Sequence, residues 1–435
     1  MNALTQRSDF EPVARTAVEK LLSWQLRRFI KIGDLRVTYP TGETESYGDG
    51  SAPAIAVVLK EQSVLFKLVT APYVALGETY MDGTLTVDND DLYGLLALLQ
   101  QNLLRRPETL PSRGLSLLRR HMRGLAQANT PNRSKSNVAH HYDLSPEFYE
   151  LFLDQDRQYS CAYFQSPHDT LETAQRNKKQ LIAKKLLLKP GCRVLDIGSG
   201  FGGLGLHLAC EYGAKVTGLT LSKEQLRVAE QRARQERLET IPKFELMDYR
   251  DVEGQFDRIV SIGMFEHVGV LQYSQFFDSI YKRLADDGVA LLHTIGRADG
   301  PGITDPWIEK YIFPGGYSPA LSEILSVIER AGLYVTDIEV WRLHYAETLK
   351  AWRERFETNI ARVRELYDER FCRMWRYYLI ASELAFRHNG HVVFQIQLAK
   401  RQDAAPLTRD YLAEKPAFCI AEADGPNKHL PIAAE

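Results

Sequence analysis

The sequence lacks the features that mark secreted, membrane-spanning and metal-binding proteins. Its five cysteines are odd in number and none stands in a C-x-x-C spacing, so neither a disulfide framework nor a metal site is expected. No apolar run approaches the roughly 20 residues that a membrane-spanning helix needs. Residues 1–12 also lack the basic and apolar parts of a signal peptide. We therefore expect a cytoplasmic protein.

An excess of either charge is also lacking. The formal net charge of −2 excludes a protein that binds nucleic acid or another polyanion over its whole surface, so no nucleic-acid partner is expected. The chain has 435 residues, 44% of them hydrophobic, which is more than one core comfortably holds. Two folded domains are the expectation. Homodimer formation is left open by the sequence.

Residues 1–104 are predicted to form a small α+β domain. Short strand-like runs at 35–38, 54–59 and 63–68 precede a helical stretch at 92–104. This mixture of short elements is typical of a compact accessory domain rather than of an extended repeat.

A local excess of positive charge follows at residues 105–136. The segment contains one acid, Glu108, and leucines are interleaved with its basic residues. The basic residues are Arg105, Arg106, Arg113, Arg119, Arg120, Arg123, Arg133 and Lys135. Such a segment suits the surface of an anionic bilayer and predicts a protein that is peripheral on the cytoplasmic membrane. A solvated linker helix is the alternative interpretation.

From residue 192 the pattern changes to alternating strands and helices, which predicts an α/β fold with a doubly wound parallel sheet. Two later strands would form a final antiparallel hairpin around a helical region at 347–386. The predicted strands are 193–197, 215–219, 243–247, 256–262, 289–294, 334–341 and 391–399. We assign this domain to residues 137–400 and expect the tail at 401–435 to be poorly ordered.

A glycine-rich turn follows the first of these strands, with Gly198, Gly200 and Gly202 placed directly after Asp196. Glycines at the carboxyl end of a strand let the backbone approach a nucleotide closely. Asp196 suits the ammonium and sulfonium of S-adenosylmethionine better than it suits a pyrophosphate. The acid that a dinucleotide site needs about 20 residues later is missing, since the second strand runs into Thr220. A turn that only packs strand on helix is the other alternative.

Several ordered motifs resemble those of the cyclopropane fatty acid synthases. They are His-His-Tyr-Asp (140–143), Tyr-Ser-Cys-Ala-Tyr-Phe (159–164), Leu-Thr-Leu-Ser-Lys-Glu-Gln (219–225), Gly-Met-Phe-Glu-His-Val-Gly (263–269), His-Thr-Ile-Gly (293–296) and Tyr-Ile-Phe-Pro-Gly-Gly (311–316). A weaker match at 76–83 extends into the N-terminal domain, which would bind lipid. The resemblance implies a Rossmann-like S-adenosylmethionine-dependent methyltransferase acting on unsaturated phospholipid acyl chains and forming a cyclopropane ring.

The same resemblance implies roles for individual residues. Tyr159 and Ser160 would cover the cofactor, and the turn at 198–203 would cradle its methionine end. Thr220 and Gln225 would hold the ribose, with Asp248 and Tyr249 near the adenine. The family also holds a bicarbonate ion as catalytic base, and its matching positions are Cys161, Glu266, His293, Ile295 and Tyr345. Ser199 and Phe201 depart from the Cys and Trp of many relatives.

The chemistry explains why such residues are needed. An alkene that accepts a methyl group becomes a carbocation, which requires a dry site and aromatic walls. Candidates for these walls are Tyr142, Phe148, Tyr163, Phe164, Phe265, Tyr311, Phe313 and Tyr317. Glu266 is expected either to orient His293 or to accept a hydrogen bond from bicarbonate, with His293 and the Ile295 N–H as donors. A methyl- or methylene-branched product, capture of water, and a non-catalytic lipid-binding protein are the alternatives.

Overall fold

The computed structural model describes residues 15–105, 144–236, 238 and 242–413. Only Arg105 of the predicted basic segment falls within these ranges, so that prediction lies outside the described residues. The chain divides into two compact units. The first contains the N-terminal region to residue 109 together with residues 305–307 and 360–384, and the second contains the rest.

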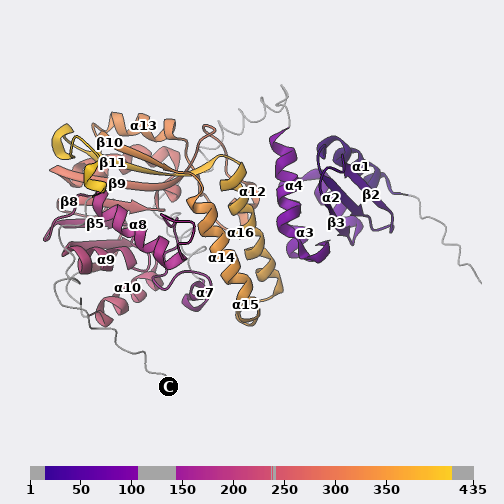
Figure 1. Ribbon diagram of the computed structural model, residues 1–435, viewed down its shortest axis with the longest axis horizontal. Helices are drawn as coiled ribbons and strands as arrows, with labels where there is room; N and C mark the ends of the chain where they lie inside the picture. Colours follow the sequence, from indigo (N-terminus) through magenta and orange to yellow (C-terminus); the bar gives the residue numbers. More distant parts are fainter. Residues whose placement is uncertain (1–14, 106–143, 237, 239–241, 414–435) are drawn as a thin grey trace, which may run out of the picture. The chain divides into compact units, whose positions relative to one another are not determined.

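A four-stranded mixed sheet forms the centre of the first unit. Its order is β2-β1-β3-β4, and only the β1–β3 pairing is parallel. The strands are β1 (Asp34–Thr38), β2 (Thr44–Gly48), β3 (Ala54–Leu59) and β4 (Leu85–Val87). Four helices accompany them, α1 (Ala17–Phe29), α2 (Gln62–Thr70), α3 (Pro72–Met81) and α4 (Leu92–Leu104), as Figure 1 shows. The predicted small α+β domain is confirmed.

The predicted strand at 63–68 is wrong, because these residues belong to α2. Val64 and Leu65 are buried next to one another, whereas Phe66 and Lys67 are exposed. Adjacent residues that share one environment follow the period of a helix, not the alternation of a strand. Pro72 then begins α3, and the non-helical backbone of the preceding Ala71 separates the two helices.

The start of α1 is fixed by a capping box. The Glu19 N–H donates to the Thr16 hydroxyl, and the Thr16 N–H donates to the Glu19 carboxylate over 3.0 Å. Gln62 of α2 adds a further hydrogen bond to Glu19 over 3.1 Å. These contacts hold the buried Glu19 side chain without any ligand.

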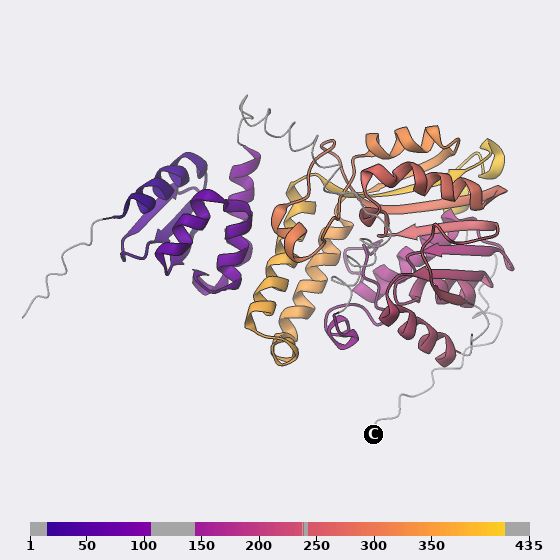
Figure 2. The same cartoon turned by 180° about the vertical axis from the view of Figure 1, so that it is seen from behind.

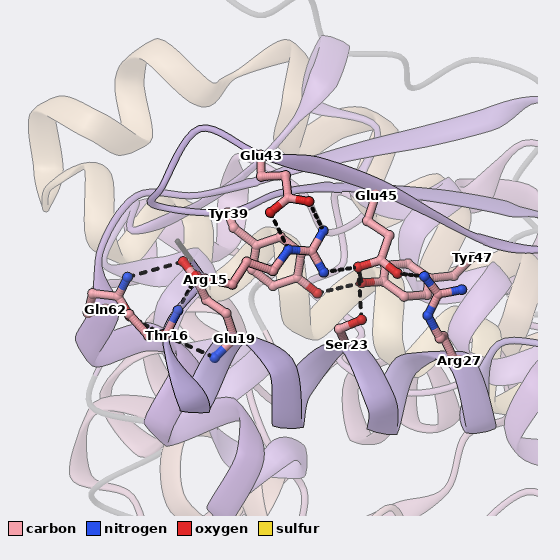
Figure 3. A network of polar contacts seen from close by, with 10 residues as sticks. All are labelled: Arg15, Thr16, Glu19, Ser23, Arg27, Tyr39, Glu43, Glu45, Tyr47 and Gln62. Carbon is pink, nitrogen blue, oxygen red and sulfur yellow. Dashed lines mark hydrogen bonds and ion pairs between the residues drawn. The ribbon is translucent and has the colours of Figure 1, made fainter. Parts of the chain in front are cut away.

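The buried carboxylate of Glu45 joins α1 to β2 (Figure 3). It accepts hydrogen bonds from the hydroxyls of Ser23 and Tyr47, each over 2.8 Å. Arg15 and Arg27 form ion pairs with the same group. Four side chains therefore converge on a single carboxylate.

Segments from far along the chain complete the first unit. Arg376, in the part of α16 (Glu369–His388) that belongs to this unit, pairs with Asp90 at 2.5 Å. The ring of Trp307 packs on Tyr377 with centroids 4.4 Å apart. Residues 360–384, sequentially inside the predicted catalytic domain, thus contribute to the N-terminal unit.

A seven-stranded sheet forms the second unit, in the order β10-β11-β9-β8-β5-β6-β7. β5 to β9 pair in parallel, while β11 runs antiparallel between β9 and β10. The strands are β5 (Arg193–Ile197), β6 (Lys215–Thr220), β7 (Lys243–Leu246), β8 (Phe256–Ile262), β9 (Leu284–Arg297), β10 (Tyr334–Trp341) and β11 (His391–Ala399). The predicted α/β class and its antiparallel hairpin are confirmed.

Helices cover both faces of this sheet, and Figure 2 shows the layers from behind. On one face α8 and α9 bury Ile182 and Leu208 against β5 and β8. On the other face α11 and α13 bury Phe276 and Ile324. The helices of this unit include α8 (Leu171–Lys185), α9 (Gly203–Tyr212), α10 (Lys223–Gln235), α11 (Tyr273–Arg283), α13 (Leu321–Arg330) and α14 (His344–Thr358).

The tail was expected to be poorly ordered from residue 401, yet residues 401–413 are described and make specific contacts. The Lys184 ammonium donates to the Leu412 carbonyl over 2.8 Å, and Arg409 pairs with Asp337 of β10 at 3.1 Å. That expectation is therefore wrong for residues 401–413. None of the helices in the described ranges combines the length and apolarity needed to cross a bilayer.

Candidate active site

The glycine turn connects β5 to α9 through three left-handed residues. Gly198, Gly200 and Gly202 have φ angles of 85°, 55° and 82°. Such φ angles are strained for residues with a side chain, which explains the glycines. A Cβ at Gly200 would meet nothing within 4 Å, so this position leaves open space above the turn.

A pocket lies at the carboxyl ends of the neighbouring parallel strands. Nine of the ten predicted cofactor residues line it, namely Tyr159, Ser160, Asp196, Gly198, Gly200, Thr220, Gln225, Asp248 and Tyr249. The tenth, Gly202, is not among the lining residues. A Cβ on it would stand 2.8 Å from side-chain atoms of Ala229 and Phe244, so packing behind the turn requires this glycine. Arg157, Gln158, Met264 and His267 also line the pocket but were not predicted.

Asp196 is the penultimate residue of β5, and its carboxylate is buried. Its Oδ2 atom has no hydrogen-bond partner among the residues that the structure describes. Burial raises the pKa of Asp196 to about 7, and the charge of Lys178 opposes that rise. A cation or a donor placed in the pocket would relieve this unpaired oxygen.

A short segment at one side of the pocket is held by α8. Ser160 and Gln158 both accept hydrogen bonds from the buried Lys178 ammonium, each over 2.8 Å. Gln175 donates to the Ser160 carbonyl over 3.0 Å. The Tyr159 ring stacks on Trp352 with centroids 5.2 Å apart. Burial lowers the pKa of Lys178 to about 8.

The ends of β6 and β7 present polar groups to the same pocket. The Thr220 hydroxyl donates to the Gln225 side-chain carbonyl over 2.8 Å. Asp248 accepts two hydrogen bonds from the guanidinium of Arg250, over 2.8 and 2.5 Å. Tyr249 packs edge-on against Phe276 of α11. Asp248 therefore already has a fixed charged neighbour, which the sequence did not predict.

Glu266 lies in the 3₁₀ turn η2 (Phe265–His267) that follows β8. Its Oε1 accepts a hydrogen bond from the Ile295 N–H over 2.6 Å, while the buried Oε2 has no hydrogen-bond partner within the described ranges. Burial raises the pKa of Glu266 to about 7, although the bond from Ile295 lowers it. In this structure Glu266 therefore accepts from the Ile295 N–H, and donation of that N–H to an added anion stays a prediction.

His293 is buried on β9, two residues before Ile295. Its Nδ1 contacts the Gln395 side-chain amide of β11 over 3.0 Å, and its ring stands perpendicular to Trp341 with centroids 5.0 Å apart. Gln395 is thus the partner of Nδ1, and the alternative in which Glu266 orients His293 stays a prediction. Burial, and then the charges of Lys178 and Lys185, hold the pKa of His293 far below its usual range.

Cys161 and Tyr345 line the interior of the same unit. The Cys161 thiol is fully buried, donates to the Ala162 carbonyl over 3.3 Å and has a pKa raised by burial. Tyr345 of α14 packs its ring on Trp352 and Phe386, with centroids 5.8 and 4.8 Å away. Of the five predicted catalytic residues, Glu266 and Ile295 are joined by a hydrogen bond. Cys161 and Tyr345 are buried and contact the residues named above.

Two of the predicted aromatic wall residues are plain core. Phe265 belongs to the apolar cluster beneath α11, stacked on Tyr273. Phe148 is fully buried against Phe152. Tyr163, in contrast, is partly exposed and packs on Trp341, the neighbour of His293. Within the parts of the chain that the structure describes, no cluster of His, Cys, Asp and Glu is arranged to hold a metal ion.

Three functional candidates escaped prediction, namely Lys178, Lys185 and Gln395. A signal existed for the last, because Gln395 and Gln397 are polar residues two apart in an otherwise apolar strand and so share one face of the sheet. The lysines gave no signal, because a lysine on an amphipathic helix is usually exposed.

Comparisons with known proteins agree with this geometry. The family model of mycolic acid cyclopropane synthetase matches residues 129–396, and a domain of unknown function matches residues 25–102. The chain is 38% identical to the cyclopropane-fatty-acyl-phospholipid synthase of Escherichia coli K12, over 81% of this chain and 89% of that protein. It is 33% identical to the tuberculostearic acid methyltransferase UfaA1 of Mycobacterium tuberculosis, over 86% and 90%.

Solved structures give the same result. The mycolic acid cyclopropane synthase CmaA1, complexed with SAH and CTAB, superposes with a TM-score of 0.58 at 34% identity. The match covers 61% of this chain and 97% of that protein. The second unit therefore has the α/β fold of the S-adenosylmethionine-dependent methyltransferases.

Proposed function

Since the chain belongs to the mycolic acid cyclopropane synthetase family, whose members are S-adenosylmethionine-dependent fatty acyl methyltransferases, we propose that it cyclopropanates the cis double bonds of phospholipid acyl chains. One observation carries the proposal. At one edge of the sheet two buried carboxylates, Asp196 and Glu266, each keep an oxygen that no residue of the described chain pairs with. Each oxygen would receive a different ligand.

Asp196 would receive the ammonium of S-adenosylmethionine, which a solved relative holds in its SAH form. The glycine turn would lie against the methionine end, with Thr220 and Gln225 at the ribose and Asp248 and Tyr249 near the adenine. Tyr159 and Ser160 would cover the cofactor. When bound, the cofactor supplies an electrophilic methyl group on a sulfonium, and the protein holds it at a fixed distance from the acyl chain.

The aromatic side chains near His293 would protect the charged chain that forms next. The π electrons of the alkene would attack the sulfonium methyl group as its bond to sulfur breaks, so that S-adenosylhomocysteine leaves and a carbocation remains on the acyl chain. Two pairs of packed rings are candidates, Tyr163 with Trp341 and Tyr345 with Trp352. These rings would exclude water and stabilise positive charge. Loss of a proton from the new methyl group then lets its carbon close the ring.

Glu266 and His293 would hold bicarbonate, the proposed base. The unpaired Glu266 Oε2 suits the hydroxyl of that ion, and the His293 imidazole suits one of its charged oxygens. Bicarbonate supplies a weak base in a dry site, while Cys161 and Tyr345 would border it. Ile295 would act by fixing the Glu266 carboxylate, to which its N–H donates.

A different fate of the carbocation is the second candidate. UfaA1 is named a tuberculostearic acid methyltransferase, and its similarity covers 86% of this chain. Methyl or methylene branching would use the same Asp196 and Glu266 with a different placement of the base. A non-catalytic lipid-binding protein is the third candidate, and it would have no need of two unpaired carboxylates.

Mass spectrometry of the lipids of an expressing bacterium tests the function. Cyclopropanation adds the mass of one CH₂ group and removes the alkene, whereas a saturated methyl branch also adds two hydrogens. Proton NMR of the lipid extract separates the ring from a methylene or allylic methyl product. Cells expressing Glu266→Gln are the control. An unchanged lipid profile with a folded, cofactor-binding protein would contradict the proposal.

Purified enzyme tests the base. We expect turnover to fall in degassed, bicarbonate-free buffer and to return on addition of bicarbonate, with a smaller response in Glu266→Gln. Full activity of both Glu266→Gln and His293→Ala would exclude the bicarbonate site.

Peripheral binding to the membrane is part of the proposal and rests on the basic segment at 105–136. Each Arg or Lys near an anionic surface contributes about 1 kcal/mol, and salt weakens the attraction. Sedimentation should show more protein bound to phosphatidylglycerol vesicles than to phosphatidylcholine vesicles, and the difference should shrink at high salt. Equal binding to both would favour the solvated linker.

A further inference from the structure

A line of polar side chains leads from the partly exposed Glu339 to the buried His293. Glu339 of β10 forms an ion pair with Lys185 of α8. The Lys185 ammonium donates to the Gln395 side-chain carbonyl over 2.7 Å, and the Gln395 amide nitrogen lies 3.0 Å from His293 Nδ1. Lys185, Gln395 and His293 are each 2% exposed or less. Four different elements thus meet in one line of hydrogen bonds.

The positions of these side chains follow from the sheet. Gln395 and His293 are directly paired in the antiparallel register of β11 and β9, so their side chains stand on the same face. The last turn of α8 carries Lys185 over that face. The perpendicular ring of Trp341 packs against the imidazole. His293 therefore has a fixed ring plane as well as a fixed partner.

The chemistry of the donors sets the direction of every hydrogen bond in this line. An ammonium has only donors, so Gln395 must turn its carbonyl oxygen to Lys185. The amide NH₂ group then faces His293, and it too can only donate. His293 Nδ1 must accept, which leaves the imidazole proton on Nε2.

We propose that Lys185 and Gln395 are positioning residues that hold His293 as a neutral imidazole with its proton on Nε2. A protonated Nδ1 would place an N–H against the Gln395 amide donor. The low pKa of His293, caused first by burial and then by the charges of Lys178 and Lys185, agrees with a neutral ring.

The tautomer of His293 determines its role toward bicarbonate, an inference that rests on the proposed function. An imidazole whose Nε2 carries the proton donates a hydrogen bond to an anion and takes up no proton from substrate through that atom. His293 would then hold bicarbonate in place and would not replace it as the base. Lys185, acting through Gln395 and His293, would thus decide which group serves as the base.

The test is the ¹⁵N signature of the imidazole in the full-length enzyme, with ¹⁵N-labelled histidine. Long-range ¹H–¹⁵N correlations distinguish the two neutral tautomers from each other and from the imidazolium. His293→Gln identifies the signal among the 11 histidines. We expect the Nε2–H tautomer at pH 6 and at pH 8. An Nδ1–H tautomer or an imidazolium would overturn the proposal.

Gln395→Glu is the decisive variant, because it keeps the shape of the side chain and replaces the donor by an acceptor. The carboxylate would accept from Lys185 at one oxygen and from His293 Nδ1–H at the other. We expect the tautomer to switch and the kcat to fall by about 10²-fold, with the affinity for S-adenosylmethionine unchanged. An unchanged tautomer in a folded Gln395→Glu protein would also overturn the proposal.

Gln397→Glu is the matched control. Gln397 is buried on the same face of β11 and donates to the Lys185 carbonyl, yet it does not contact His293. We expect the His293 tautomer of Gln397→Glu to match the wild type.

If Gln395→Glu fails to fold, Lys185→Met serves instead, since a Gln395 amide freed from Lys185 should give a mixture of His293 tautomers. A pure Nε2–H signal in Lys185→Met would contradict the role of Lys185. The wild-type NMR result does not depend on bicarbonate, so failure of the bicarbonate experiment alone would leave this assignment standing.

Discussion

Two buried polar clusters of this molecule differ in how fully their charges are paired. In the first unit Glu45 accepts from two arginines and two hydroxyls, and none of the ten residues drawn in Figure 3 has a buried polar side-chain atom without a partner. In the second unit the buried Asp196 and Glu266 each keep one oxygen that pairs with no described residue.

The difference has a physical meaning. A buried carboxylate without enough donors costs free energy, and it responds by holding a proton more tightly. The pKa of both Asp196 and Glu266 is accordingly raised to about 7. A fold that can satisfy Glu45 completely could satisfy these groups too. These unpaired oxygens support the cofactor and bicarbonate positions proposed above, whereas the paired cluster stabilises its own unit.

The largest effect is expected at Glu266. Glu266→Gln keeps an acceptor for the Ile295 N–H and removes the charge. Because the group acts late in the reaction, we expect turnover to fall about 10²-fold or more, with the affinity for S-adenosylmethionine unchanged in calorimetry. Glu245→Gln, at an ion pair with Lys243 on the rim of the sheet, is the control and should keep full activity. Equal losses of turnover in Glu266→Gln and Glu245→Gln would contradict the distinction between unpaired and paired carboxylates.

Asp196→Asn should change binding and stability in opposite directions. Binding of S-adenosylmethionine should weaken about tenfold to 10²-fold, because a charged partner of its ammonium is lost. The folded protein keeps a proton on Asp196 up to about pH 7, whereas the unfolded chain releases it near pH 4. Wild-type stability without cofactor therefore falls as the pH rises through this window.

Removing this titration should stabilise the cofactor-free protein at pH 8 by roughly 4 kcal/mol, with little change at pH 4. Urea unfolding of the wild type and of Asp196→Asn at both pH values measures the effect. A variant that is destabilised at pH 8 would show that Asp196 has a partner in the protein after all.

Features built from contiguous residues, such as single strands and the glycine turn, could be predicted from the sequence. The order strand, Asp196, glycine turn and helix is contiguous, so periodicity and turn chemistry suffice, and β5, β8, β10 and β11 begin and end where predicted. The region 63–68 was misread because six apolar-rich residues fit a helix and a strand equally well.

The pairing of His293 with Gln395 could not be predicted, because it joins residues 102 apart. It exists because β11 inserts between β9 and β10, and this strand order is a property of the whole sheet. The contact of Ile295 with Glu266 has the same origin, since it needs β8 and β9 side by side. The sequence supplied the residue types of the site and left their partners undetermined.

Glu45→Gln tests the paired cluster. It neutralises a carboxylate that is only 8% exposed and that Arg15 and Arg27 share, so we expect a loss of about 2 kcal/mol in the free energy of unfolding. Hydrogen exchange of the full-length protein should become faster in α1 and β2 and stay unchanged at the glycine turn. Unchanged exchange in α1 would show that this cluster contributes as little as a surface pair.

The smallest effect is expected at Glu43, which shares Arg15 with Glu45 and provides a matched variant within one network. The Glu43 side chain is 51% exposed against 8% for Glu45. Water and salt compete for an exposed carboxylate, and such pairs contribute about 0.2–1 kcal/mol. Glu43→Gln should therefore cost less than 1 kcal/mol, and the cost should vanish in about 1 M salt, where charges are screened within roughly 3 Å. The cost of Glu45→Gln should persist at that salt concentration, because burial and not mere proximity gives its ion pairs their strength. If both variants lose the same stability and respond alike to salt, burial is not what separates the paired from the unpaired carboxylates. The raised pKa values of Asp196 and Glu266 would then need another cause.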